Sequence, residues 1–298
     1  MKTRLAAALF AFSLSFAGAN SFAFPGGGGG GPFPGIEEYG RQVVIGIETP
    51  FASGSGVIIG KRGSTYYFLT AAHVGKGDPS REEFMAYTLQ DKGNKIRILS
   101  FESPPEFKGK DLVIGSFKSS KELLVVPIFA LGDQSTWSAY GSYNNRRLNQ
   151  KEQIHGDALV SGISIPTKTI TIPLFRSSPA SIMDRAPGNA DGYELIYLAT
   201  STVPGMSGGP VLASRACPKW EAKGTPWGEL SGGYTGLIAV HGRSEEYGQT
   251  ASRSGASLGV PLDIFKNFWV KNAGKYGIPY GESYRQHVRY QCLNHALY

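Results

Sequence analysis

From about residue 36 onward the chain alternates short apolar runs with turns rich in Gly, Pro, Asn and Asp, and this pattern restricts the fold most. The runs are Gln42–Glu48, Val57–Ile59, Tyr67–Leu69, Leu112–Phe117, Leu123–Phe129, Leu195–Thr200, Val211–Ala213 and Leu237–Val240. Each is short enough to be a single β-strand. Many short strands without interleaved helices predict an all-β barrel or sandwich.

Two further segments indicate local structure. The runs Val57–Ile59 and Tyr67–Leu69 flank the turn at residues 61–64, which predicts a β-hairpin. Near the end of the chain, residues 261–272 have apolar side chains at helical spacing. These side chains are Leu262, Phe265, Phe268 and Trp269. We therefore expect a C-terminal helix beside the β-structure.

A serine between glycines follows a turn-rich segment, in the sequence Pro204-Gly-Met-Ser-Gly-Gly-Pro-Val-Leu212. A glycine at 205 lets the backbone turn with no Cβ in the way, so the N–H groups of Gly205 and Ser207 can point at one spot. Two such donors form an oxyanion hole, in which losing one donor typically costs about 10²–10³ in rate. The pattern indicates that Ser207 is a nucleophile.

A histidine and an aspartate stand at the ends of two expected strands. His73 ends the segment Thr70-Ala-Ala-His, and Asp111 precedes the run at residues 112–117. A serine hydroxyl becomes a nucleophile when an imidazole takes its proton and a carboxylate orients that imidazole. We expect His73 and Asp111 to fill these roles. Asp91 is the rival carboxylate, in a polar stretch typical of a turn.

The segments 70–73, 111–114 and 205–210 each resemble a catalytic signature of the trypsin-like (chymotrypsin-fold) serine endopeptidases, in the same chain order. The resemblance covers roughly residues 40–272 and implies two six-stranded antiparallel β-barrels with a C-terminal helix and the catalytic residues between the barrels. It is closest to bacterial secreted members, because the disulfides of chymotrypsin are absent. Met206 stands where trypsin and chymotrypsin carry an aspartate that pairs with a newly cut N-terminus, which argues against their zymogen switch.

Three positions bear on substrate preference. Ser201 stands where proteases selective for basic residues carry an aspartate. Thr202 and His241 resemble the threonine and the pocket-strand histidine of glutamyl endopeptidases and exfoliative toxins, although Gly242 replaces an aromatic that is common there. A hydroxyl and an imidazole can both donate to a carboxylate, and a protonated His241 would add charge assistance. The resemblance implies cleavage after glutamate; alternatively, His241 is a buried strand histidine bonded to backbone.

The ends of the chain differ in composition from the middle. Residues 1–23 have a basic start, an apolar run and a small-residue cleavage site, as a signal peptide does. Residues 24–36 form a Gly/Pro-rich flexible leader, 37–275 the protease domain and 276–298 a C-terminal tail or ordered cap. Residues 131–158 are expected to be surface loops or an insertion. We expect a secreted or periplasmic protein free of the membrane after signal removal; the alternative is a retained signal anchor.

Charge and cysteine content restrict partners and cofactors. Removing residues 1–23 lowers the formal net charge from +7 to +5. The sequence has no dense run of Lys and Arg, so we expect no nucleic-acid binding. Cys217 and Cys292 either form one disulfide in an oxidising compartment or remain two free thiols. No Cys or His pair has metal-ligand spacing, so we expect neither a metal nor another cofactor.

Together these features predict a secreted serine endopeptidase that acts on protein or peptide substrates. One alternative is a non-catalytic binding protein on a protease fold, although such proteins usually lack at least one catalytic residue. Another is a serine protease with a different side-chain preference.

Overall fold

The computed structural model describes residues 35–89, 94–132, 157–164, 174–185, 192–199, 202–216, 233–244 and 256–295. The expected signal peptide, almost all of the Gly/Pro-rich leader and most of residues 131–158 lie outside this part of the chain, as do Asp91, Ser201 and Cys217.

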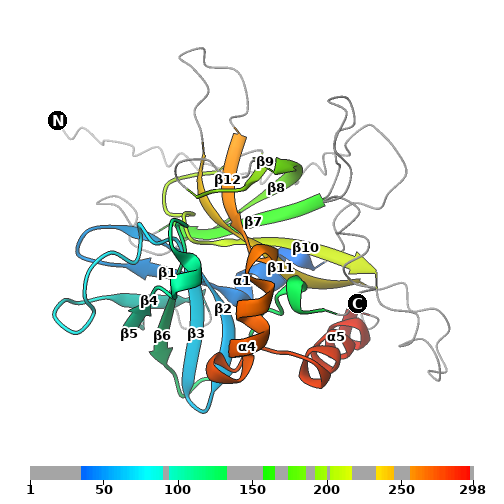
Figure 1. Cartoon of the computed structure of the whole chain (residues 1–298), viewed down its shortest axis with the longest axis horizontal. Helices are drawn as coiled ribbons and strands as arrows, with labels where there is room; N and C mark the ends of the chain where they lie inside the picture. The colour runs from blue at the N-terminus through cyan, green and yellow to red at the C-terminus, as the bar shows by residue number, and fades with distance from the viewer. Residues whose placement is uncertain are drawn as a thin grey trace, which may run out of the picture. The chain divides into compact units, whose positions relative to one another are not determined.

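The first half of the described chain forms a closed six-stranded antiparallel barrel (Figure 1). Its strands are β1 (Val44–Glu48), β2 (Ser53–Arg62), β3 (Thr65–Thr70), β4 (Met85–Thr88), β5 (Ile96–Glu102) and β6 (Val113–Lys118). They pair in the order β1-β2-β3-β6-β5-β4, and β1 closes the barrel on β4. Apolar and aromatic side chains such as Ile45, Ile58 and Phe68 fill the interior.

The second half forms another closed antiparallel barrel with the same number of strands. These are β7 (Asp157–Ser164), β8 (Leu174–Arg185), β9 (Leu195–Ala199), β10 (Pro210–Ala216), β11 (Gly233–Ser244) and β12 (Ala256–Pro261). They pair in the order β10-β11-β12-β9-β8-β7, and β7 returns to β10. The expected pair of six-stranded antiparallel barrels is therefore confirmed, as is the hairpin formed by β2 and β3.

The strand predicted at Leu123–Phe129 is wrong. Residues 122–127 cross from one barrel to the other without joining a ladder. The Val126 N–H donates to the Ile58 carbonyl in the first barrel at 2.9 Å, and the Pro127 carbonyl accepts from Leu237 N–H in the second at 2.8 Å. The segment is apolar because it is buried against both barrels, which a sequence pattern cannot distinguish from a strand.

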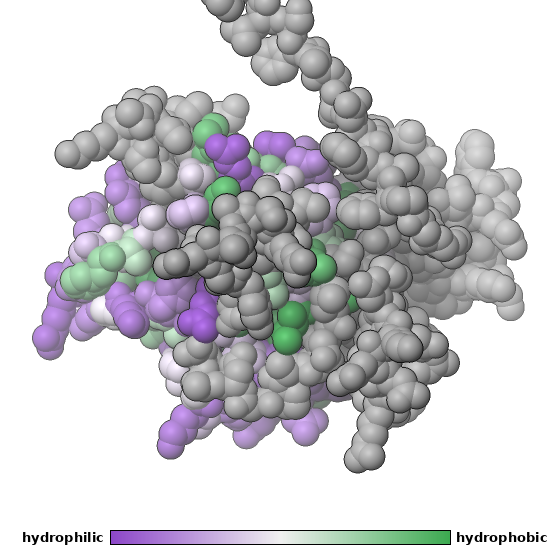
Figure 2. All heavy atoms as spheres, turned by 90° about the horizontal axis from the view of Figure 1, so that it is seen from above, coloured by the Kyte–Doolittle hydropathy of each residue, from purple (hydrophilic) through white to green (hydrophobic). Residues whose placement is uncertain are grey.

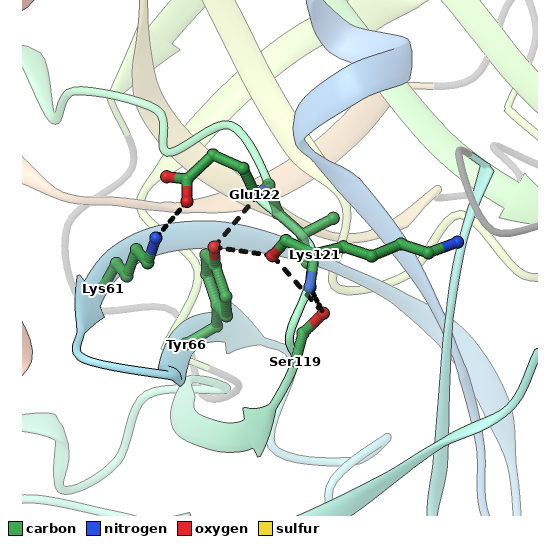
Figure 3. A network of polar contacts seen from close by, with 6 residues as sticks. Lys61, Tyr66, Ser119, Lys121 and Glu122 are labelled. Atoms are coloured by element: carbon green, nitrogen blue, oxygen red, sulfur yellow. Dashed lines mark hydrogen bonds and ion pairs between the residues drawn. The ribbon is translucent and has the colours of Figure 1, made fainter.

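Polar contacts fix the start of this crossing segment (Figure 3). The Tyr66 hydroxyl, which is fully buried on β3, donates to the Lys121 carbonyl at 3.0 Å and accepts from Leu123 N–H at 3.0 Å. Beside it, Lys61 forms an ion pair with Glu122. The β2–β3 hairpin therefore determines where the chain leaves the first barrel.

The α-helices lie at the two ends of the described chain. Helix α1 (Ile36–Val43) occupies the start of the strand predicted at 42–48, so that β1 begins only at Val44. The predicted C-terminal helix is present as α4 (Lys266–Tyr276), preceded by the short helix η4 (Asp263–Phe265). The other short helices are η2 (Pro105–Phe107) and η3 (Phe129–Leu131). Aromatic contacts attach α4 to the first half, since Phe107 lies 5.0 Å from Phe268 and 5.5 Å from Trp269 between ring centroids.

Residues 282–295 form a second C-terminal helix, α5 (Glu282–His295), which packs beside β11 (Figure 1). The Gln291 amide binds the backbone of one strand residue twice: Thr235 N–H donates to Oε1 at 2.8 Å, and Nε2 donates to the Thr235 carbonyl at 3.0 Å. Cys292, fully buried on the same helix, is disulfide-bonded. The segment is thus attached to the second barrel by polar and apolar contacts.

The surface in Figure 2 mixes hydrophilic residues with small separate hydrophobic areas among the residues it colours. Large apolar side chains exposed singly, such as Phe51 on the β1–β2 turn, are ordinary in a folded protein. Within the described ranges, no helix combines the length and apolar character that a membrane span requires.

Candidate active site

Strand pairing brings His73 and Asp111 together. His73 lies three residues after the last residue of β3, and Asp111 lies two residues before the first residue of β6. These strands are antiparallel neighbours in which Thr70 faces Val113, so the chain leaves β3 where it enters β6. The sequence folds this way because both strands bury apolar side chains in one barrel, and the two polar residues lie just beyond the paired region.

The Asp111 carboxylate contacts His73 twice, once at the backbone and once at the ring. Asp111 Oδ1 accepts the backbone N–H of His73 at 2.8 Å, and Asp111 Oδ2 lies 2.7 Å from His73 Nδ1. An ionised carboxylate only accepts, so Nδ1 carries the hydrogen and Nε2 of the neutral ring is left as an acceptor. Burial raises the pKa of Asp111, but hydrogen bonds from His73 and Tyr193 outweigh it, and the pKa is lowered overall. The aspartate is therefore ionised at neutral pH.

The turn that carries Ser207 is held against the first barrel. The Ser207 carbonyl accepts the backbone N–H of Ser55 on β2 at 2.7 Å. Gly208 has φ 86°, and a Cβ there would lie 2.2 Å from both the Ser55 carbonyl oxygen and Thr70 Oγ1. Only glycine permits this approach. The nucleophile turn therefore lies against the end of β3, three residues before His73.

The peptide groups around Ser207 are oriented by their carbonyls. The Met206 carbonyl accepts Gly209 N–H at 2.9 Å, and a trans peptide then directs Ser207 N–H the opposite way. Gly205 has φ 95°. Among the hydrogen bonds of the described residues, none uses the N–H of Gly205 or Ser207 as donor. Both donors are available for a bound oxygen, as the oxyanion-hole assignment requires.

Met206 is fully buried beneath the turn. Its sulfur accepts Val203 N–H at 3.4 Å, and a Cβ on Gly162 would come within 2.6 Å of the Met206 Cα. The turn is thus supported by apolar packing of Met206 against β7. Trypsin and chymotrypsin instead have an ion pair at this position.

Ser55 is a site residue that the sequence reasoning missed. Its buried hydroxyl donates to the Gly205 carbonyl at 2.6 Å and accepts Ile163 N–H from β7 at 2.7 Å. One side chain of the first barrel thereby fixes the peptide that follows Gly205 in the second barrel. The only signal in the sequence was its place between two glycines, Gly54 and Gly56.

His241 lies on β11, beside the nucleophile turn. Its backbone N–H donates to the Gly209 carbonyl at 2.8 Å, and its carbonyl accepts Gly208 N–H at 2.7 Å. Its ring Nδ1 is hydrogen-bonded to the Tyr197 hydroxyl on β9, so within the described residues the ring binds a side chain and not the backbone of the alternative interpretation. Thr202 is half-buried at the start of the same turn region.

Burial, with a smaller contribution from the nearby His73, lowers the pKa of His241 to about 4. His241 is 2% exposed, and with this lowered pKa its ring is neutral at neutral pH in the free protein, so the expected charge assistance from a protonated His241 is absent there. The Tyr197 hydroxyl is 3.4 Å from the Leu258 carbonyl, a weak contact. A hydroxyl hydrogen directed at His241 Nδ1 leaves the ring hydrogen on Nε2, which can then donate.

The two cysteines and possible metal ligands are the remaining candidate site residues. Cys292 is disulfide-bonded, while Cys217, the only other cysteine of the chain, lies outside the described residues. No group of three or more His, Cys, Asp or Glu side chains in the described part of the chain could hold a metal ion.

Residues 54–216 match the family model described as "Trypsin-like peptidase domain". No curated protein sequence matches the chain. Among solved structures, Rv3671c from M. tuberculosis H37Rv, a serine-to-alanine mutant in an inactive form, is 12% identical with a TM-score of 0.46, covering 82% of this chain and 96% of that one. A second structure of the Rv3671c protease, also inactive, is 16% identical with a TM-score of 0.43, covering 83% and 98%.

Proposed function

Because the chain belongs to the trypsin-like peptidase family, we propose that it is a serine endopeptidase that cleaves protein substrates by acyl transfer through Ser207, His73 and Asp111. The observation that carries the proposal is the double contact of Asp111 with His73, at 2.8 Å and 2.7 Å, next to the turn that holds Ser207. The arrangement leaves His73 Nε2 as an acceptor on the side away from the aspartate.

The reaction follows from these roles. Ser207 Oγ attacks the scissile carbonyl while His73 takes its proton, and Asp111 stabilises the imidazolium. The oxygen of the tetrahedral intermediate binds the N–H groups of Gly205 and Ser207. His73 then gives the proton to the leaving amine, and water hydrolyses the acyl-enzyme by the same sequence of proton transfers.

We further infer a preference for glutamate before the scissile bond. A ring held by Tyr197 through Nδ1 keeps its Nε2–H as a buried donor, and a carboxylate is the strongest acceptor for it. A substrate without an acceptor would leave that donor unpaired, which is the condition for strong discrimination. Thr202 is the second proposed donor; Ser201 is proposed to line the same pocket.

A peptide library tests both parts of this proposal. We expect cleavage after glutamate to be fastest, after aspartate slower and after lysine or arginine slowest, with all cleavage lost in Ser207→Ala. Matched substrates with glutamate or glutamine measure the contribution of the charge at nearly constant shape. Preferred cutting after basic or large apolar residues would refute the glutamate preference, whereas activity retained in Ser207→Ala would refute the triad.

The proposed location is outside the cytoplasm. The signal-like residues 1–23 and the disulfide at Cys292 both support export to an oxidising compartment. N-terminal sequencing of the mature protein distinguishes a cleaved signal peptide from a retained anchor.

A further inference from the structure

Tyr193 lies just before β9 and is 4% exposed. Its hydroxyl donates to Asp111 Oδ2 at 2.5 Å, the same oxygen that lies 2.7 Å from His73 Nδ1. Resting on the proposed triad, we propose that Tyr193 is a positioning residue that fixes the Asp111 carboxylate and, through it, the tautomer and orientation of His73. Tyr193 comes from the second barrel, whereas His73 and Asp111 come from the first.

The backbone on either side of Tyr193 is docked on the loop that carries Asp111. Gly192 has φ 74°, and a Cβ there would lie 2.0 Å from the Gly109 carbonyl oxygen, so the two backbones are in direct contact. On the other side, Glu194 forms a partly buried ion pair with Lys110. Two contacts independent of the hydroxyl therefore hold the tyrosine in place.

Strand β11 leaves room for the aromatic ring of Tyr193. The register of β11 against β12 shifts between His241 and Arg243, and Gly242 lies at this irregularity. A Cβ on Gly242 would come within 2.0 Å of Tyr193 Cε1, so any larger residue would displace the ring. The departure at Gly242 from related enzymes, which often carry an aromatic there, thus has a physical reason: the space belongs to Tyr193.

The charges around the carboxylate agree with this role. Asp111 accepts from His73 twice and from Tyr193 once, while the Arg243 guanidinium lies 5.5 Å from the centroid of the tyrosine ring. Without the hydroxyl, Oδ2 loses the one donor that does not move with His73. The carboxylate can then rotate, and its negative charge is less well stabilised.

The test is Tyr193→Phe, with Tyr66→Phe as matched control. Tyr66 is a buried tyrosine whose hydroxyl binds the backbone of the crossing segment and makes no contact with His73 or Asp111 among the described residues. We expect Tyr193→Phe to lower kcat about tenfold with KM unchanged, since a hydrogen bond to a charged group is worth at least about this much. Asp111, followed by carbon-13 NMR of labelled aspartate, should titrate at higher pH than in the wild type. Tyr66→Phe should lower the melting temperature and leave both kcat and the Asp111 titration unchanged.

A second variant keeps the hydroxyl. Gly242→Ala places a methyl group in the space of the ring, and we expect the same loss of kcat and the same upward shift in the Asp111 titration. Wild-type kcat and an unchanged Asp111 titration in Tyr193→Phe would overturn the inference even where Ser207→Ala confirms the protease. If the wild type has no peptidase activity, the proposed function fails, and the Asp111 titration alone decides whether Tyr193 positions the carboxylate.

Discussion

Two tyrosines near β9 contact different parts of the proposed site: Tyr193 binds Asp111 of the triad, and Tyr197 binds His241 of the proposed substrate pocket. Tyr193 donates to a carboxylate between the barrels, beside a His73 side chain that is 41% exposed. Tyr197 lies inside the second barrel and binds His241, which is 2% exposed. The first histidine lies open to solvent, while the second is held neutral by burial. The difference suggests that proton transfer and side-chain recognition are separated by solvent access.

The largest expected effect is on the pH dependence of stability, and it comes from the histidines that burial keeps neutral. Burial lowers the pKa of His241 to about 4, and likewise that of His287 on α5. Unfolded histidines take up a proton near pH 6.5, whereas the folded ones resist until about pH 4. The unfolded state therefore binds more protons between these values, so the free energy of unfolding falls as the pH drops from about 6.5 to 4 and is unaffected by these groups outside that window.

We expect the buried His241 to contribute up to about 3 kcal/mol to this fall, and the half-buried His287 less. Urea unfolding at pH 7, 5 and 4 measures it. His287→Gln should reduce the slope without changing substrate preference, because His287 contacts Tyr39 at 3.2 Å and not the proposed site. Equal slopes in wild type, His287→Gln and a His241 variant would show that neither histidine is held neutral.

Removing the pocket imidazole should change specificity more than chemistry. In His241→Ala we expect the rate ratio between matched glutamate and glutamine substrates to fall about 100-fold, with a much smaller loss on the poorer substrate. Tyr197→Phe sharpens the test, because it keeps the ring and removes only the partner that fixes its tautomer, so an intermediate ratio is expected. A ratio unchanged in both variants would assign recognition to other residues.

The smallest of these effects concerns the contact that joins the two barrels at the nucleophile turn. Ser55→Ala leaves the Gly205 carbonyl and Ile163 N–H without their shared partner. We expect kcat to fall about tenfold while the glutamate preference is retained. The change loosens the turn that carries Gly205 and Ser207 but leaves His241 in place. Ser55→Thr keeps the hydroxyl and should recover part of the rate. If Ser55→Ala lowered the glutamate preference together with kcat, the triad region and the region around His241 would not act separately.

Local sequence patterns predicted the parts of this molecule that depend on local chemistry. The alternation of apolar runs and turns predicted an all-β barrel or sandwich, and the family resemblance implied the two six-stranded barrels. Strand pairing then brings His73 and Asp111 together, and the turn that holds Ser207 docks on the first barrel. Tyr193, Tyr197 and Ser55 could not be found this way. Their partners lie 82, 44 and 150 positions away in the chain, and a buried tyrosine or serine has the same local pattern whether or not it touches a site residue.

The failures have related causes. Residues 123–129 read as a strand because burial against two barrels gives the same apolar run as a place in a sheet. Helix α1 was missed because it is short, and α5 because its apolar spacing is weak and its attachment depends on Gln291 and a disulfide. The state of His241 depends on how completely the barrel buries it, which the sequence does not encode locally.

The most direct measurement of the central claim is labelling by a fluorophosphonate probe, which reacts covalently with an activated serine. We predict stoichiometric labelling of the wild type at Ser207, located by mass spectrometry, and none in a Ser207→Ala variant with an unchanged melting temperature. Labelling at a different residue, or none in correctly folded wild type, would contradict the assignment of Ser207 and leave the protein a binding module on a protease fold.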